Sequence, residues 1–266
     1  MSQVIVVTSG KGGVGKTTTT ANLGTGLALK GKRVVLVDTD IGLRNLDVVM
    51  GLENRIVYDL VDVVEGTCRL KQALIRDKRY EGLMLLPAAQ TRNKMDVNPE
   101  QMKTLMQELR DNFDYVIVDC PAGIEQGFVN AVAGADDAII VTVPEVSAVR
   151  DADRIIGLLG ANGLTSARLL INRYNQAMVK KGDMLDTADI LDILGIRLLG
   201  IVPEDQAIVR SSNLGEPIVT TANPAGQAYQ NVVKRMLGED VPLAVSKDDT
   251  GFIARMRRIF SRNKGA

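Results

Sequence analysis

The chain has 266 residues, of which 45% are apolar and 24% charged, a balance typical of a globular protein. Basic and acidic residues number 32 each, so net charge gives no argument for nucleic-acid binding. The sequence contains no histidine, which excludes serine–histidine and cysteine–histidine catalysis and histidine-ligated zinc. Its two cysteines, Cys68 and Cys120, cannot form a disulfide framework and fit a reducing, cytosolic setting.

Short β-branched segments alternate with longer segments of helical period. We expect strands at Val4–Thr8, Arg33–Asp38, Leu83–Leu86, Tyr115–Asp119, Ala138–Val143, Leu169–Asn172 and Leu198–Val202. Helices are expected at Thr17–Lys30, Pro99–Asp111, Glu125–Val132, Val149–Leu159, Met184–Leu194 and Ala225–Leu237. This alternation predicts a doubly wound α/β fold with a mostly parallel sheet, helices on both faces and ligands at the carboxyl ends of the strands.

The composition changes once, near Gly238. We therefore expect one globular domain over residues 1–238, a polar linker over 239–250 and a short tail over 251–266. The first residues have neither a basic segment nor a long apolar stretch, so we expect no signal peptide. No apolar run is long enough to span a bilayer, which predicts a soluble protein with at most a surface anchor.

A phosphate-binding loop is predicted where the first strand meets the first helix. The segment is Gly10-Lys11-Gly12-Gly13-Val14-Gly15-Lys16-Thr17-Thr18. Glycines allow backbone N–H groups to approach phosphates, and the helix N-terminus adds a positive dipole end. In such a loop Lys16 contacts the β- and γ-phosphates and the Thr17 hydroxyl binds Mg²⁺. The signal is specific, because the pattern and its strand–helix context agree.

The loop contains a second lysine, Lys11, directly after its first glycine. The pattern GKGGVGKT is the deviant form of the Walker A loop. Within one chain a second cation adds little, since Lys16 already serves the phosphates. Unless it contacts a group outside its own chain, Lys11 is an ordinary solvated charge on a loop.

Carboxylates follow two of the expected strands. Asp38 and Asp40 end the second strand, and Asp119 ends the strand over 115–119. Side chains at such positions can hold Mg²⁺ or its waters and orient an attacking water, although an isolated aspartate there is more often a turn or cap residue. With no histidine to act as a base, we expect slow intrinsic hydrolysis.

The nucleoside site is expected at the ends of two later strands. Asn172 and Arg173 follow one, and Pro203, Glu204 and Asp205 follow the next. An amide can both donate to and accept from an adenine edge, though these residues could also be simple turn residues. Asn93-Lys94-Met95-Asp96 matches a guanine-reading motif, but no apolar strand precedes it, so we favour a solvated loop.

Several segments together resemble the MinD/ParA family of ATPases, and in particular its division-site-selection branch. They are the GKGGVGKTT loop, DTDIGLRNLD at 38–47, DCPAG at 119–123, PEVSAVRDAD at 144–153 and IVPEDQ at 201–206. The resemblance covers nearly the whole chain. It implies an ATP-dependent homodimer, reversible membrane attachment, recruitment of the division inhibitor MinC, and hydrolysis stimulated by an activator such as MinE or another topological factor.

The resemblance also implies roles for individual residues. It places Lys11 on the phosphates bound by the second copy of a dimer, Asp40 near the attacking water and Asn172 near adenine. Segments 38–47 and the loop after Asp119 are then switch regions. Partner contacts are implied for Arg44, Asp47, Asp151 and Asp153.

The tail has the pattern of an amphipathic helix. At about 100° per residue its apolar side chains fall within an arc of roughly 120°, and its arginines lie outside that arc. The apolar residues are Phe252, Ile253, Met256, Ile259 and Phe260, and the basic residues include Arg255, Arg257 and Arg258. This pattern is typical of a helix lying on an anionic membrane. Docking on the protein core and nucleic-acid binding are the alternatives.

A membrane-cycling ATPase on the cytoplasmic face of the inner membrane is the function that we expect. One tail of about a dozen residues should bind weakly, whereas two tails on an ATP-bound dimer gain avidity of about 10²–10⁴. The alternative is a ParA-type DNA-partition ATPase. The neutral net charge and the early first strand, which leaves no room for an N-terminal DNA-binding domain, argue against it.

Overall fold

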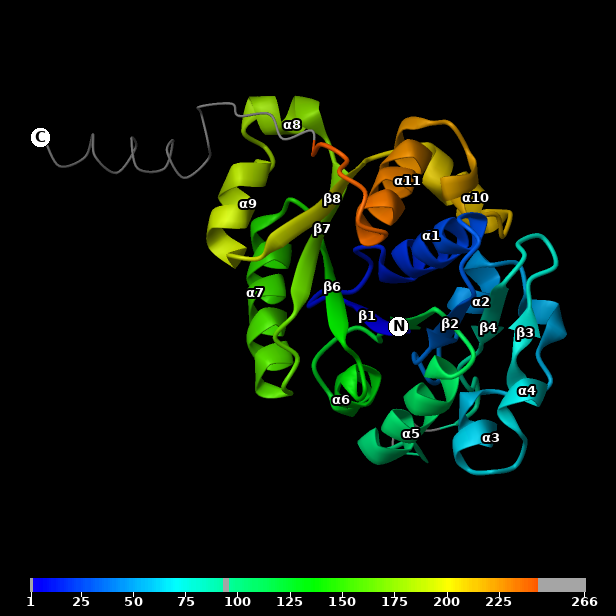
Figure 1. Ribbon diagram of the computed structural model, residues 1–266. Helices are drawn as coiled ribbons and strands as arrows, with labels where there is room; N and C mark the ends of the chain where they lie inside the picture. Colours follow the sequence, from blue (N-terminus) through cyan, green and yellow to red (C-terminus); the bar gives the residue numbers. More distant parts are fainter. Residues whose placement is uncertain (1, 93–95, 244–266) are drawn as a thin grey trace, which may run out of the picture.

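The computed structural model describes residues 2–92 and 96–243. Its centre is an eight-stranded sheet with the order β3-β4-β2-β5-β1-β6-β7-β8, parallel except for the antiparallel pair β3–β4 (Figure 1). The strands are β1 (Gln3–Thr8), β2 (Val34–Asp38), β3 (Ile75–Arg76), β4 (Leu83–Leu86), β5 (Tyr115–Asp119), β6 (Asp137–Thr142), β7 (Ala167–Tyr174) and β8 (Arg197–Pro203). All seven predicted strands are confirmed to within two residues, and β3 is an addition.

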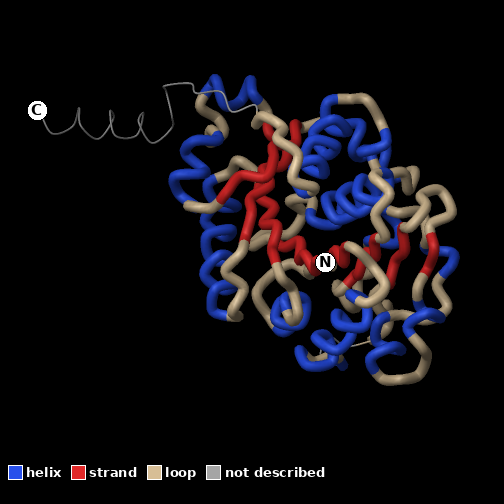
Figure 2. Tube along the Cα trace, in the orientation of Figure 1, coloured by secondary structure: helices blue, strands red, loops and turns tan. Residues whose placement is uncertain are grey.

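Helices cover both faces of the sheet (Figure 2). One face packs on α1 (Lys16–Leu29), α2 (Leu46–Val49), η3 (Ile218–Thr220) and α11 (Pro224–Met236). The opposite face packs on α3 (Leu60–Val64), α4 (Leu70–Ala73), α5 (Pro99–Arg110), α6 (Gln126–Val132), α7 (Val146–Ala161) and α9 (Thr187–Leu194). In β1, Val4 and Val6 face the second layer and Ile5 and Val7 the first, as the period of a strand buried on both faces requires.

The six predicted helices are all present, with corrected ends. Helix α7 begins at Val146 rather than Val149. Helix α9 begins at Thr187 rather than Met184, because the Asp186 carboxylate accepts from Asp189 N at 2.7 Å and caps the helix there. The short elements α2, η1 (Glu53–Arg55), α3, α4, α8 (Gln176–Lys181), α10 (Gln206–Asn213) and η3 were not predicted.

Two predictions fall outside the described residues. These are the tail over 251–266 with most of the linker before it, and the first three residues of the Asn93–Asp96 motif. Across residues 2–92 and 96–243, no helix is both long and apolar enough to cross a membrane.

Candidate functional site

The predicted phosphate loop lies between β1 and α1, at the carboxyl edge of the sheet. Two of its glycines are required by close packing. A Cβ on Gly10 would lie 2.4 Å from the backbone oxygen of Asp151 in α7, and one on Gly15 would lie 2.3 Å from Nδ2 of Asn172. Gly15 also has a φ of 99°, in the left-handed region that favours glycine. The loop is therefore shaped by α7 on one side and by the end of β7 on the other.

Lys16 is the first residue of α1 and is buried, with 8% of its surface exposed. Its Nζ donates to Ser9 Oγ at 3.1 Å, and Ser9 Oγ donates to the backbone oxygen of Lys11 at 2.7 Å. The ammonium is thus held inside the curve of the loop. This is the position that the motif predicts for the lysine that contacts phosphates.

Lys11 has a different environment. Its Nζ lies 2.9 Å from Oε2 of Glu145, the residue that precedes α7, and donates to Ser147 Oγ at 3.4 Å. The side chains of Lys11 and Glu145 are 42% and 55% exposed. The two lysines of the loop therefore lie in different places: Lys16 is buried inside the loop, and Lys11 is on the exposed surface beside α7.

Two buried carboxylates face the loop from neighbouring strands. Asp38 and Asp119 are register partners at the ends of β2 and β5. Asp38 accepts from the backbone N–H groups of Asp40 at 2.9 Å and Leu46 at 3.1 Å, and Asp119 accepts from Thr20 Oγ1 at 3.3 Å. Burial raises the pKa of Asp38 to about 6. Burial, followed by repulsion from Asp38, raises the pKa of Asp119 to about 8.

These oxygens fit a magnesium ion whose coordination shell is completed by phosphate oxygens and water. Thr17 hydrogen-bonds Asp119, so a hydroxyl and a carboxylate meet at the start of α1. The raised pKa values of the two buried acids show that the nearby Lys16 charge does not fully compensate their burial, and a divalent cation would supply further positive charge. Among the described residues no three acidic or thiol side chains converge, so protein ligands alone do not form a closed cage. Mg²⁺ bound to nucleotide phosphates typically has such a partial protein shell.

Asn172 and Arg173 hold the loop from the end of β7. Asn172 is buried and donates through Nδ2 to the backbone oxygen of Val14 at 2.8 Å. The Arg173 guanidinium donates to the backbone oxygen of Gly13 at 2.8 Å. Arg173 itself has a φ of 53°. Positive φ is uncommon outside glycine and points to a backbone fixed by its surroundings.

The next strand end completes this side of the site. Pro203 ends β8, and the Asp205 carboxylate caps α10 by accepting from Ala207 N at 2.8 Å. Glu204 Oε2 accepts from Asn175 Nδ2 at 3.0 Å, which joins the loops after β7 and β8. The structure thus brings all five nucleoside candidates to one edge of the sheet.

Comparison with known proteins places the chain in a family. A family model described as an AAA domain matches residues 2–164. The septum site-determining protein MinD of Bacillus subtilis is 60% identical over 264 residues, which cover 98% of this chain and 98% of that protein. The chain belongs to the MinD family. It is a cell-division site-selection ATPase, and the resemblance predicted from the motifs is confirmed.

Solved MinD structures are similar throughout the domain. The MinC:MinD cell division protein complex of Aquifex aeolicus matches with a TM-score of 0.85 and 50% identity, covering 91% of this chain and 98% of that one. MinD of Pyrococcus horikoshii, solved with Mg-ADP, matches with a TM-score of 0.81 and 29% identity, covering 89% and 96%.

The residues that the MinD resemblance assigns to partners fall in two places. Arg44 and Asp47 pair in the segment after β2, with Arg44 Nε 3.0 Å from Asp47 Oδ2, and Asp47 is fully buried. Asp153 is exposed on α7, and Asp151, two residues earlier, is half-buried against Gly10. Of these four residues, Asp151 is therefore the one that lies against the phosphate loop of this MinD chain.

Four site residues escaped the sequence analysis. Ser9 and Thr20 are unremarkable in the sequence, and Glu145 and Ser147 lie 134 and 136 residues from the lysine that they contact. Only their contacts with Lys16, Asp119 and Lys11 reveal their part in the MinD site. The one signal in the sequence was the PEVSAVRDAD segment, which contains the last two.

Proposed function

We propose that this MinD chain cycles between the cytoplasm and the inner face of the cell membrane under the control of Mg-ATP. As an ATP-bound homodimer it binds anionic lipid and recruits a MinC-type division inhibitor. Hydrolysis, stimulated by a MinE-type activator or another topological factor, releases it. Nucleic acid is not expected to be a partner.

One observation carries the proposal: of the two lysines in the phosphate loop, one is buried and the other is exposed. Lys16 is buried and held by Ser9, whereas Lys11 is exposed and held by Glu145 on the outer side of the loop. An exposed ion pair contributes only about 0–1 kcal/mol, so Lys11 exchanges its partner at little cost. The phosphates bound by a second copy offer it a stronger one.

Each site residue then has a task. Lys16 and the backbone of Gly10–Thr18 bind the phosphates, Asn172 and Arg173 fix the loop, and Pro203, Glu204 and Asp205 border the nucleoside. Thr17, Asp38 and Asp119 hold Mg²⁺, which neutralises phosphate charge, and Asp40 orients the attacking water. The MinD neighbour solved with Mg-ADP supports this assignment.

The contact between Lys11 and Glu145 joins the nucleotide to the partner surface. Glu145 is the N-cap residue of α7, which carries Asp151 and Asp153, and Gly10 packs against the backbone of Asp151. A change of partner by Lys11 therefore acts on the helix to which the family assigns partner contacts. The neighbouring MinC:MinD complex supports a MinC-type partner.

Membrane attachment rests on the sequence of residues 251–266. ATP brings two tails together, and their avidity converts nucleotide state into membrane affinity. Release after hydrolysis then needs no change within the tail.

Co-sedimentation with phosphatidylglycerol-rich vesicles tests the proposal. The full chain should bind with ATP and not with ADP, and a chain that ends at Thr250 should bind in neither state. Lys11→Ala should abolish the ATP-dependent binding and the dimer seen by light scattering. Lys30→Ala, at an exposed lysine after α1, is the matched control and should bind normally.

Three results would contradict the proposal. Equal binding with ATP and ADP would separate the anchor from the nucleotide. A Lys11→Ala variant that binds like the wild type would remove the dimer step. ATP-dependent binding to DNA in place of vesicles would favour a partition ATPase.

A further inference from the structure

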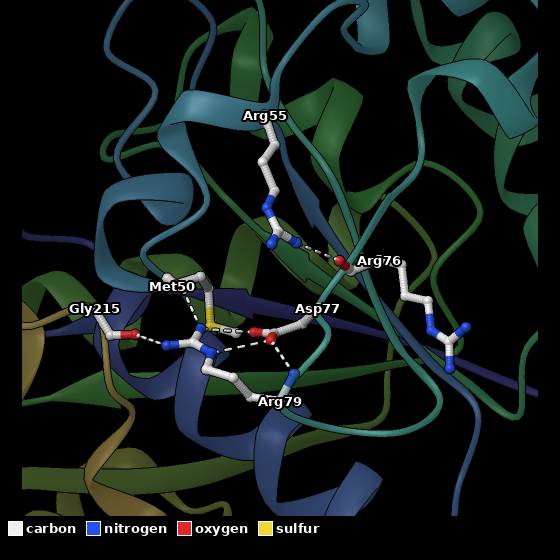
Figure 3. Close-up of polar contacts among 6 residues, drawn as sticks. All are labelled: Met50, Arg55, Arg76, Asp77, Arg79 and Gly215. Carbon is white, nitrogen blue, oxygen red and sulfur yellow. Dashed lines mark hydrogen bonds and ion pairs between the residues drawn. The ribbon is translucent and has the colours of Figure 1, made fainter.

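One arginine joins three segments that are far apart in the sequence (Figure 3). Arg79 lies in the turn between β3 and β4, and its guanidinium makes two bonds to the Asp77 carboxylate, from Nε at 3.0 Å and from Nη2 at 2.7 Å. Nη1 donates to the backbone oxygen of Gly215 at 2.7 Å, and Nη2 also donates to that of Met50. Asp77 is 1% exposed, so the ion pair is buried on the acidic side.

The two carbonyls belong to the ends of two helices. Met50 is the C-cap residue of α2, and Gly215 directly follows Leu214, the C-cap residue of α10. The backbones meet at Gly51 and Gly215, because a Cβ on Gly215 would lie 2.5 Å from the Cα of Gly51. Both glycines have positive φ, 62° and 66°. Arg79 thus bridges two helix ends that touch without side chains between them.

The opposite ends of these helices reach the nucleotide site. The first residue of α2, Leu46, donates its N–H to Asp38 Oδ2 at 3.1 Å. The N-cap residue of α10 is Asp205, which directly follows Pro203 and Glu204. One helix therefore starts on the magnesium side of the site and the other on the nucleoside side.

We infer that Arg79 is a positioning residue that couples the magnesium side of the ATP site to its nucleoside side. By fixing the carboxyl ends of α2 and α10 against one another, it fixes the Leu46 amide on Asp38 and the Asp205 cap beside the nucleoside loop. If α2 moves, α10 moves with it. Both halves of this inference rest on the function proposed above, which assigns Asp38 to magnesium and Asp205 to the nucleoside.

Arg79 donates to three acceptor groups, and this distinguishes a residue that bridges the ends of α2 and α10 from one that only neutralises the charge of Asp77. One positive charge suffices for Asp77, and a lysine supplies it. Only the planar fork of an arginine donates to Asp77, Met50 and Gly215 together. Arg79→Lys therefore keeps the buried ion pair, whose loss alone can unfold a protein, and removes the bridge.

Steady-state ATP turnover of the full chain tests the inference. For Arg79→Lys we expect the KM for ATP and the Mg²⁺ concentration for half-maximal rate to rise together, each roughly three- to tenfold, as is usual for coupling through a contact network. The melting temperature should stay near that of the wild type. Arg55→Lys is the matched control, because Arg55 ties η1 to the Arg76 carbonyl at 3.1 Å in the same hairpin without reaching α10.

A second variant attacks the same contact from the other side. Gly215→Ala keeps the arginine but forces the backbones at residues 51 and 215 apart, so it should raise the same two constants. Combined with Arg79→Lys, its effect should be less than the product of the two single effects. A double variant whose fold-change equals the product of the two single fold-changes would contradict a shared contact.

The inference fails if Arg79→Lys lowers the melting temperature and leaves both constants unchanged, which is the behaviour of a purely structural residue. It also fails if one constant moves alone. Asp205→Ala in the wild-type background separates this from failure of the nucleoside assignment. If Asp205→Ala leaves the KM for ATP unchanged, the assignment is wrong. If it raises the KM while Arg79→Lys does not, the coupling is wrong.

Discussion

Two groups of residues at the phosphate loop, which we call the floor and the rim, each contain one lysine. They differ in burial and in the strength of their contacts. The floor consists of Ser9, Lys16, Asp38 and Asp119, all buried. The rim consists of Lys11, Glu145 and Ser147, joined by an ion pair with about half of its surface exposed. Charges in the floor interact through a low dielectric and hold one arrangement, whereas those in the rim are screened by water and exchange readily. The floor therefore suits chemistry and the rim suits recognition of a second molecule.

Removing the floor lysine tests the first half of this comparison and should give the largest effect. Lys16→Gln keeps a donor near Ser9 but removes the charge, so we expect kcat for ATP to fall by roughly 100-fold or more, the scale of losing a preorganised charge-stabilising group. Steady-state turnover at saturating ATP measures this kcat. A loss below tenfold would mean that Lys16 does not contact the transferred phosphoryl group.

Forcing the phosphate loop away from α7 at Gly10, which directly follows Ser9 of the floor, should have the next largest effect. In Gly10→Ala the new Cβ meets the backbone of Asp151 at 2.4 Å, so the loop or the helix must shift. We expect a loss of stability of about 1–3 kcal/mol, typical of overpacking, and weaker nucleotide binding. Gly157→Ala, at a position of α7 with no positive φ and no atom within 4 Å of the added Cβ, is the control for adding a methyl group alone. Thermal unfolding with and without Mg-ADP compares them, and equal effects would show that the Gly10–Asp151 contact is unimportant.

The buried acids make the stability of the metal-free protein depend on pH. Their pKa values in the folded state, about 6 for Asp38 and about 8 for Asp119, lie above the ordinary value of 3.8. As pH rises from about 4 to 8 the unfolded chain loses these protons first, so the folded state is progressively disfavoured. We expect the melting temperature without Mg²⁺ to fall by several degrees over this range, since 1 kcal/mol corresponds to about 2–4 °C in a chain of this size.

Two comparisons identify the groups responsible. Asp119→Asn should remove most of this pH dependence, because the amide does not ionise. Saturating Mg-ADP should also reduce it, because the cation stabilises both charged carboxylates. If the slope is the same in the wild type and in Asp119→Asn, the buried pair is not its source.

The parts of the molecule that the sequence predicts are those with local signals. Every apolar strand, the phosphate loop and the aspartates at strand ends carry a pattern within a few neighbouring residues. Helix α10 has eight residues and none of them is fully buried, so its apolar pattern is too short to stand out, and β3 is only two residues long. Contacts such as Arg79 with Gly215 or Lys11 with Glu145 join residues more than 130 positions apart, and no local pattern reports them.

The smallest effect concerns the rim. Glu145→Gln removes the charge that holds Lys11 in the monomer, so Lys11 becomes available to the phosphates of a second copy. The ATP concentration for half-maximal dimerisation should fall by at most about fivefold, because an exposed pair is worth up to about 1 kcal/mol. Glu100→Gln, which breaks the exposed pair with Lys103 on α5, is the control and should change nothing. A rise in the required ATP concentration would show that Glu145 acts within the dimer, as a contact of the assembled surface rather than as a competitor for Lys11.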